Sequence, residues 1–117
     1  MKYPLFIEVP LFTKKLREIG FTEIDLQELQ NSLIENPYIG KLIVGTGGIR
    51  KHRVALKGRS KSRSARLCYL YYDYYQVFVL VTIYTKKEKD NLSQREKDIL
   101  KKLSNDLLTE IKGRFNL

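Results

Sequence analysis

The residues best suited to chemistry in this sequence lie in one short basic stretch, residues 49–66. It contains eight of the 22 Lys and Arg residues and no Asp or Glu. The rest of the chain has 14 basic and 13 acidic residues, so the formal net charge of +9 is almost entirely local. Charge concentrated in so short a segment attracts polyanions more strongly than charge spread over a surface. The stretch therefore predicts a site for a phosphate backbone, with a solvated basic loop as the alternative.

Basic side chains alone can cleave RNA without a metal ion. RNA carries its own nucleophile, the ribose 2′-OH, so an enzyme needs only to position the backbone, assist proton transfer and stabilise the crowded phosphorane. Arg supplies permanent charge and bidentate phosphate contacts, and a Lys crowded by other cations has a lowered pKa that suits proton transfer. The stretch therefore favours chemistry on a phosphodiester.

Other chemistries find less support in the sequence. The single His52 and the single Cys68 cannot furnish a zinc site, and no acidic cluster near the basic stretch could hold magnesium, so we expect no cofactor and no metal. The Gly-rich segment 45–48 lacks the Lys-Ser/Thr of a nucleotide-binding loop and is interpreted as a tight turn feeding a sheet. His52 is expected to be a packed or surface residue rather than a catalytic base.

The basic stretch begins in a segment, 49–57, that alternates like a β-strand. One face would carry three cations and one small residue and would line a groove. Its residues are Lys51, Arg53, Ala55 and Lys57. The other face would carry His52, Val54 and Leu56. Residues 58–65 have the Gly, Ser and charge content of an exposed loop.

Two apolar segments, 66–72 and 76–84, predict strands joined by a turn near 73–75. In the second segment, alternation assigns one face to Val77, Val79, Val81 and Ile83. It assigns the other face to Phe78 and Leu80, and two apolar faces indicate a strand covered on both sides. Arg66 opens the first strand beside the groove, and 86–89 return to charge where the second ends.

Helix signals flank these strands. Pro10 suits the first turn of a helix that Gly20 ends, and Thr22 with Asp25 forms a capping box for a second helix that stops before 36–37. A third helix would start at the capping box of Ser93 and Glu96. Its packed face would hold Leu100, Leu103, Leu107 and Ile111, and Gly113 would be its C-cap. The segment Tyr3–Val9 is predicted to be a short edge strand.

These elements predict an α+β fold, with two N-terminal helices and a C-terminal helix packed on a central, mainly antiparallel sheet of about four to five strands. A length of 117 residues suits one domain, 1–117. The lone Cys68 lies in an apolar run and indicates a buried thiol in a reducing compartment. Because no segment has the character of a signal peptide or a membrane span, we expect a cytoplasmic protein.

The order and spacing of these residues resemble one known family. The segment Gly45-Thr46-Gly47-Gly48-Ile49-Arg50-Lys51-x-Arg53, with the basic loop, Arg66 and a tyrosine-rich strand after it, is similar to the HigB-like branch of the RelE/ParE toxin superfamily. So is the later Thr82-Ile83-Tyr84-x-Lys86-x-Glu88. The likeness covers nearly the whole chain. It implies the RelE-like fold and a type II toxin that inhibits translation as a ribosome-dependent mRNA endoribonuclease, an mRNA interferase.

The resemblance also implies partners. They are mRNA in the ribosomal A site, 16S rRNA, and a cognate antitoxin of the helix-turn-helix or ribbon-helix-helix type. Operator DNA would be reached only through the antitoxin, and no membrane is involved. Two alternatives stay open: a ParE-like inhibitor that binds DNA gyrase without catalysis, and a plain RNA-binding module that stacks bases on Tyr and Arg. A cation-lined sheet is the feature that an RNA-cleaving enzyme needs and a gyrase inhibitor does not.

Residue roles follow from the resemblance and from the basic stretch. Arg66 is expected to stabilise the phosphorane, Lys57 to assist the 2′-OH, and Lys86 or Lys87 to protonate the leaving 5′-oxygen. The residues expected to bind RNA are Lys51, Arg53, Arg59, Lys61 and Arg63. The chain departs from the family just before Arg66, where it has Arg63-Ser64-Ala65 in place of Gly-Gly or Ser-Gly.

Overall fold

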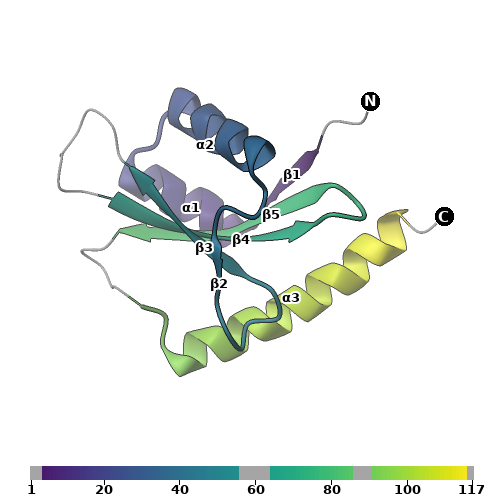
Figure 1. Cartoon of the computed structure of the whole chain (residues 1–117). Coiled ribbons are helices and arrows are strands. Elements are labelled where there is room, and N and C mark those ends of the chain that lie inside the picture. Colours follow the sequence, from purple (N-terminus) through teal and green to yellow (C-terminus); the bar gives the residue numbers. More distant parts are fainter. Residues whose placement is uncertain (1–3, 56–63, 86–90, 116–117) are drawn as a thin grey trace.

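A computed structural model describes residues 4–55, 64–85 and 91–115 (Figure 1). Its elements, in chain order, are β1 (Leu5–Glu8), α1 (Pro10–Ile19), α2 (Glu23–Glu35), β2 (Lys41–Leu42), β3 (Arg50–Ala55), β4 (Ser64–Tyr72), β5 (Val77–Thr85) and α3 (Gln94–Phe115). Within the described ranges, no helix combines the length and the apolar character needed to cross a membrane.

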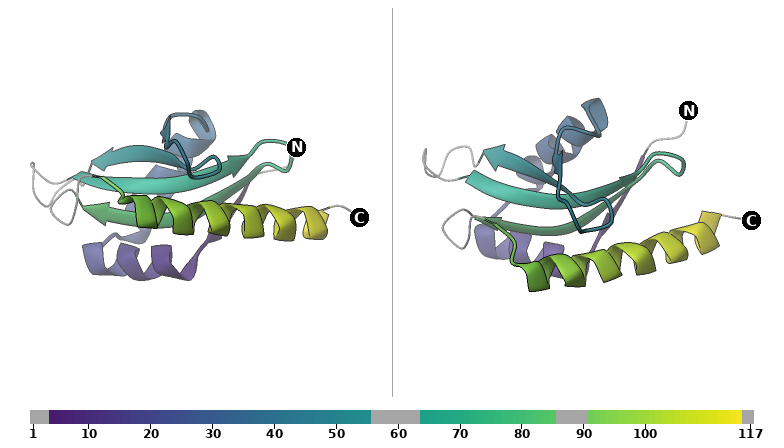
Figure 2. Two further views of the ribbon diagram at one scale, coloured as in Figure 1. Left: turned by 90° about the horizontal axis from the view of Figure 1, so that it is seen from below. Right: turned by 60° about the horizontal axis from the view of Figure 1, so that its bottom comes forward.

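The five strands form one sheet in the order β1-β5-β4-β3-β2. β1 runs parallel to β5, and the other three pairs are antiparallel. Helices α1 and α2 cover one face of the sheet and α3 covers the other (Figures 1 and 2). The predicted α+β class, with two early helices and a last helix on a mainly antiparallel sheet, is therefore confirmed, as is the edge position of the first strand.

Two apolar cores lie on the two faces of the sheet. Phe12 and Leu16 of α1 and Leu29 and Leu33 of α2 pack on Leu67, Tyr69, Phe78, Leu80 and Ile83. On the opposite face, Leu100 and Ile111 of α3 pack with Leu92, Cys68, Leu70, Val77, Val79, Val81 and Tyr84. Leu103 and Leu107 contact this second core, so the predicted packing face of the last helix is confirmed. Side chains of β4 and β5 are buried on both faces of the sheet, so these two strands form the centre of the structure.

A β-bulge in β5 changes which residues share a face. Leu80 pairs with Tyr69 and Thr82 pairs with Cys68, which leaves Val81 as an extra residue. Alternation restarts after it. The prediction that Ile83 shares a face with Val81 is therefore wrong, because Ile83 packs in the α1–α2 core and Tyr84 packs in the α3 core.

The helix starts follow the predicted capping boxes. The Asp25 amide donates to Thr22 Oγ1 at 3.1 Å and the Thr22 amide donates to Asp25 Oδ2 at 2.8 Å. The Ser93–Glu96 pair forms the same two bonds, at 3.0 and 3.1 Å. Gly20 ends α1 at φ 84°.

The predicted end of the last helix is wrong. α3 continues through Gly113 to Phe115, and Gly113 has no positive φ. The Arg114 Nη2 to Glu110 Oε1 ion pair at 3.0 Å spans this last turn and supports it.

The Gly-rich segment 45–48 forms a tight turn that leads into β3, as predicted. Gly45, Gly47 and Gly48 all have positive φ. Thr46 is buried; its Oγ1 donates to the Ile43 carbonyl at 2.7 Å and accepts from the Ile49 amide at 3.2 Å. Ser104 Oγ of α3 donates to the Thr46 carbonyl at 3.0 Å. The turn therefore fixes the start of β3 against α3.

Candidate nucleic-acid interface

Arg53 and Arg66 lie directly opposite each other at one end of the sheet. They are cross-strand partners in β3 and β4, and Tyr84 of β5 pairs with Arg66 on its other side. Paired residues of antiparallel strands point to the same face. Tyr84 belongs to the α3 core, so this row of three residues lies on the α3 face of the sheet.

The two guanidinium groups have no acidic counterpart among the described residues. The ion pairs formed there join Lys15 to Glu18 and Arg114 to Glu110, and neither involves this end of the sheet. Like charges at directly opposite positions destabilise a sheet. An anion between them would relieve that repulsion, and an Arg fork matches the geometry of a phosphate group. The row is therefore suited to binding phosphate.

Arg66 is held by the chain just before it. Its Nη1 donates to Ser64 Oγ at 2.7 Å and, at the longer distance of 3.4 Å, to the Ala65 carbonyl. The strand begins earlier than predicted, since Ser64 and Ala65 belong to β4 and pair with Ala55 and Val54 instead of forming a loop. This extra pairing makes the residues next to Arg66 part of the sheet.

Tyr84 lies beside Arg66 in the sheet and is only 1% exposed. Burial raises the pKa of the Tyr84 hydroxyl far above its ordinary value, the neighbouring Cys68 adds to this, and the charge of Arg66 opposes it. The hydroxyl therefore stays protonated at neutral pH. Cys68 itself is buried, as the sequence predicted.

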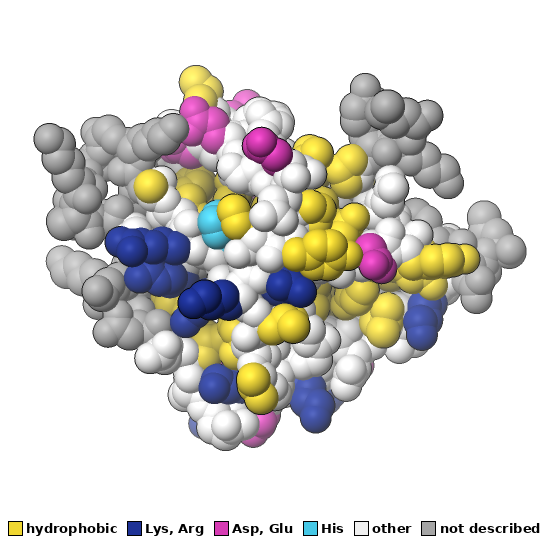
Figure 3. Space-filling model, in the orientation of Figure 1, with side chains coloured by type: hydrophobic (Ala, Val, Ile, Leu, Met, Phe, Trp, Pro, Cys, Tyr) yellow, Lys and Arg dark blue, Asp and Glu magenta, His cyan; other side chains and the backbone are white. Residues whose placement is uncertain are grey.

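Lys51 lies on the same face, two residues before Arg53. It pairs with Cys68, and its Nζ donates to Asn91 Oδ1 at 3.4 Å, close to the start of α3. In Figure 3, Lys and Arg side chains gather over the end of β3, on the left of the view. The predicted basic face of β3 is confirmed for Lys51 and Arg53.

The remaining predicted site residues lie outside the described ranges: Lys57, Arg59, Lys61, Arg63, Lys86 and Lys87. The chain leaves β3, enters β4 and leaves β5 at the same end of the sheet, since Ala55 pairs with Ser64 and Ala65 pairs with Thr85. Both segments that carry these residues are thus attached to the end that holds the arginine row. Within the described ranges, no three His, Cys, Asp or Glu side chains gather to form a metal site.

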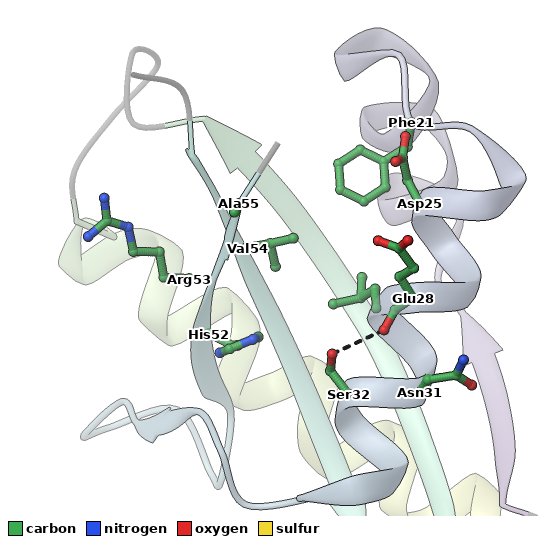
Figure 4. A pocket seen from close by; sticks show the side chains of 10 residues that line it. Phe21, Asp25, Glu28, Asn31, Ser32, His52, Arg53, Val54 and Ala55 are labelled. Carbon is green, nitrogen blue, oxygen red and sulfur yellow. Dashed lines mark hydrogen bonds between the residues drawn. The ribbon is translucent and has the colours of Figure 1, made fainter. Parts of the chain in front are cut away.

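A groove of about 400 Å³ lies between α2 and the opposite face of β3. Figure 4 shows His52 and Val54 pointing toward α2 and Arg53 pointing away from it. On the helix side the groove is lined by Phe21, Asp25, Glu28, Leu29, Asn31 and Ser32. Burial lowers the pKa of His52 below its ordinary value. His52 is thus partly packed, as predicted, and lies on the other face from the arginine row.

Sequence reasoning missed Ser64 and Tyr84 as neighbours of Arg66. Ser64 has a signal, because residues two apart in a strand share a face, but the Gly, Ser and charge content of 58–65 predicts a loop there. Tyr84 had none, because the bulge at Val81 decides its face.

One protein-family model matches residues 13–115, and it describes the RelE toxin of the RelE/RelB toxin–antitoxin system. Two solved structures are similar to this chain. One is a double mutant of the E. coli toxin RelE in the free state, with 16% identity over 70% of this chain and 82% of that chain and a TM-score of 0.48. The other is the intact E. coli RelBE toxin–antitoxin complex, with 18% identity, 76% and 99% coverage and a TM-score of 0.48.

Proposed function

Since the chain belongs to the RelE toxin family, we propose that it is a type II toxin that cleaves messenger RNA on the ribosome. The observation that carries the proposal is the pair of opposed arginines, Arg53 and Arg66, which have no acidic partner among the described residues. Directly opposed like charges lower the stability of a sheet, and a phosphate bound between them would offset that loss. The segment Gly45–Arg53 supports assignment to the HigB-like branch.

In the proposed reaction, the 2′-oxygen of the RNA attacks the adjacent phosphorus and the 5′-oxygen of the next nucleotide leaves. Arg66 stabilises the negative charge of the phosphorane. Its Nη1 is engaged by Ser64, while Nη2 and Nε form no hydrogen bond with described residues and are left for two phosphate oxygens. The products are a 2′,3′-cyclic phosphate, or the 3′-phosphate it hydrolyses to, and a free 5′-hydroxyl.

Proton transfers in this proposal belong to lysines outside the described ranges. Lys57 takes part in removing the proton of the 2′-OH, and Lys86 or Lys87 gives a proton to the leaving oxygen. The residues proposed to hold the RNA backbone are Lys51, Arg53, Arg59, Lys61 and Arg63. No cofactor takes part in these steps.

The proposed partners follow from the charge of this face. The formal net charge of +9 and the cationic end of the sheet favour binding to the phosphate backbones of mRNA in the ribosomal A site and of 16S rRNA. Neutralisation requires a partner that covers or blocks the arginine row, and an acidic antitoxin of the helix-turn-helix type would be steered there by complementary charge. On this proposal the toxin acts in the cytoplasm, where messages are translated.

The test is single-turnover cleavage of a message on programmed ribosomes, with and without a 2′-deoxy substitution at the scissile nucleotide. We expect cleavage of the unmodified message only, with cyclic or 3′-phosphate ends. Cleavage of the deoxy message would show that the 2′-OH mechanism is wrong. A protein that leaves the message intact but inhibits DNA supercoiling by gyrase would be the ParE-like alternative instead.

A further inference from the structure

The Arg66 guanidinium has one short, well-defined contact in the described structure. Nη1 donates to Ser64 Oγ at 2.7 Å, whereas the bond to the Ala65 carbonyl is long at 3.4 Å. A hydroxyl that accepts from a charged donor at this distance forms a strong hydrogen bond. Ser64 therefore holds one edge of the guanidinium.

Ser64 is itself fixed in place. It is only 6% exposed and pairs with Ala55 at the start of β4. Because residues two apart in a strand share a face, the Ser64 hydroxyl and the Arg66 side chain leave the sheet on the same side. The Ser64 hydroxyl is thus held in place by the paired backbone of β4 and by burial of its short side chain.

The hydrogen bond to Ser64 counteracts electrostatic repulsion on Arg66. Arg53 lies directly opposite, so repulsion between the two guanidinium groups favours conformations in which Arg66 swings away from the row. On the far side, the buried ring of Tyr84 restricts the space into which it can move. The bond from Nη1 to Ser64 opposes this movement and favours one orientation of the guanidinium.

We propose that Ser64 is a positioning residue that orients Arg66 toward the scissile phosphate. The inference rests on the proposed function and deepens it. Ser64 does not contact the RNA; it fixes the direction of the two N–H edges that do.

Three substitutions test the role of the hydroxyl. Ser64→Ala removes it, and Ser64→Thr and Ser64→Val form a matched pair of equal shape with and without it. In single-turnover cleavage on programmed ribosomes, we expect Ala and Val to lower the rate about tenfold and Thr to stay within about threefold of wild type, because misoriented catalytic groups lose rate more than affinity. Ribosome binding should change less than about twofold.

A double-mutant cycle separates positioning from general damage. Adding Ser64→Ala to an Arg66→Ala protein should cause no further loss, since residues that act as a unit are not additive. Ser104→Ala is the control. The Ser104 side chain is 2% exposed and its hydroxyl donates to the carbonyls of Thr46 and Leu100, so its loss should lower stability and leave the cleavage rate unchanged. Equal rates for the Thr and Val proteins would overturn the proposal.

Side-chain NMR of Arg66 tests the same contact without cleavage. In the wild type the hydrogen bond should slow rotation about the Nε–Cζ bond, so that the Nη protons of Arg66 are resolved. In the Ser64→Val protein they should average, and in the Ser64→Thr protein they should return. If the wild type cleaves no message but shows this pattern, the proposed function fails and the positioning contact stands; if Val and Thr give the same spectra, the contact itself is refuted.

Discussion

The two faces of β3 differ in chemistry although they alternate along six residues. One face carries Lys51 and Arg53 beside Arg66 of β4, and its guanidinium groups have no acidic partner among the described residues. The other face carries His52 and Val54 and forms a groove with α2, whose wall includes Asp25 and Glu28. The strand thus separates a surface with two opposed arginines from a groove whose wall holds two carboxylates.

The face on which a side chain lies, more than its position in the sequence, sets its role in β3. His52 is adjacent to Arg53 in the sequence and is the only His of the chain, yet it points away from the arginine row (Figure 4). Because side chains alternate with a period of two, a register slip of one residue would exchange the two faces. Pairing of β3 with β4 over six residue pairs prevents that slip.

Arg66→Ala should lower the cleavage rate more than any other single change. Loss of a charge that stabilises the transition state should lower single-turnover cleavage about 10²–10³-fold while ribosome binding stays within a few-fold. His52→Ala, on the opposite face, is the control and should stay within about threefold. Full activity of Arg66→Ala, or an equally large loss of cleavage rate in His52→Ala, would show that the two faces do not differ in their role in cleavage.

Arg53→Ala should act on binding more than on rate. A backbone contact contributes Coulomb attraction and counterion release, so affinity for the programmed ribosome should fall about tenfold and the slope of log K against log salt should decrease by about one. Cleavage at saturating protein should remain within a few-fold. Arg53→Lys keeps the charge and should restore the salt slope; an unchanged slope in Arg53→Ala would show that Arg53 contacts no phosphate.

On the groove side, Thr22→Ala should affect stability alone. It removes half of the capping box of α2, which costs about 1 kcal/mol of unfolding free energy. Urea unfolding measures this loss, and cleavage by the folded protein should be unchanged. Ser32→Ala is the matched variant, since its hydroxyl bonds the Glu28 carbonyl inside the same helix and should change stability by less than about 0.5 kcal/mol.

The smallest effect is a pH dependence from His52. Burial lowers the pKa of its imidazole below 6.5, so the unfolded chain takes up a proton at a higher pH than the folded chain. The stabilising contribution is therefore complete above about pH 6.5 and is lost as pH falls through the folded pKa. The melting temperature of the wild type should fall more between pH 7.5 and pH 5.5 than that of His52→Gln. An equal fall in the melting temperatures of both proteins would show that groups other than His52 cause the pH dependence.

Local signals predicted much of this fold and part of the site. Capping boxes at Thr22 and Ser93 involve residues three apart, and the alternation that separates Lys51 and Arg53 from His52 is local as well, so both were readable in the sequence. The bulge at Val81 was not, because it arises from how β5 pairs with β4 and not from any residue type within it. The pairing of Arg53 with Arg66 was not readable either, because it depends on the register between β3 and β4, which no local pattern fixes.

Other differences have equally physical causes. The residue type of Gly113 predicts a C-cap, yet its φ is not positive and the helix continues to Phe115, with the exposed Arg114–Glu110 pair in its final turn. Ser64 and Ala65 have a loop-like composition, but pairing with β3 draws them into β4. The roles of Lys57, Lys86 and Lys87 remain predictions, since these residues lie outside the described ranges.

The parallel pairing of β1 with β5 affects the order in which the chain folds during synthesis. Leu5 pairs with Val77, and Phe6 stacks on Phe78 with ring centroids 4.8 Å apart, so the first strand made joins the last. Contacts so distant in sequence form late, after the local β4–β5 hairpin. The apolar faces of α1 and α2 must then wait for the sheet they cover until Thr85, the end of β5, has left the ribosome. A nascent chain therefore cannot place its arginine row in a complete sheet until β5 has left the ribosome.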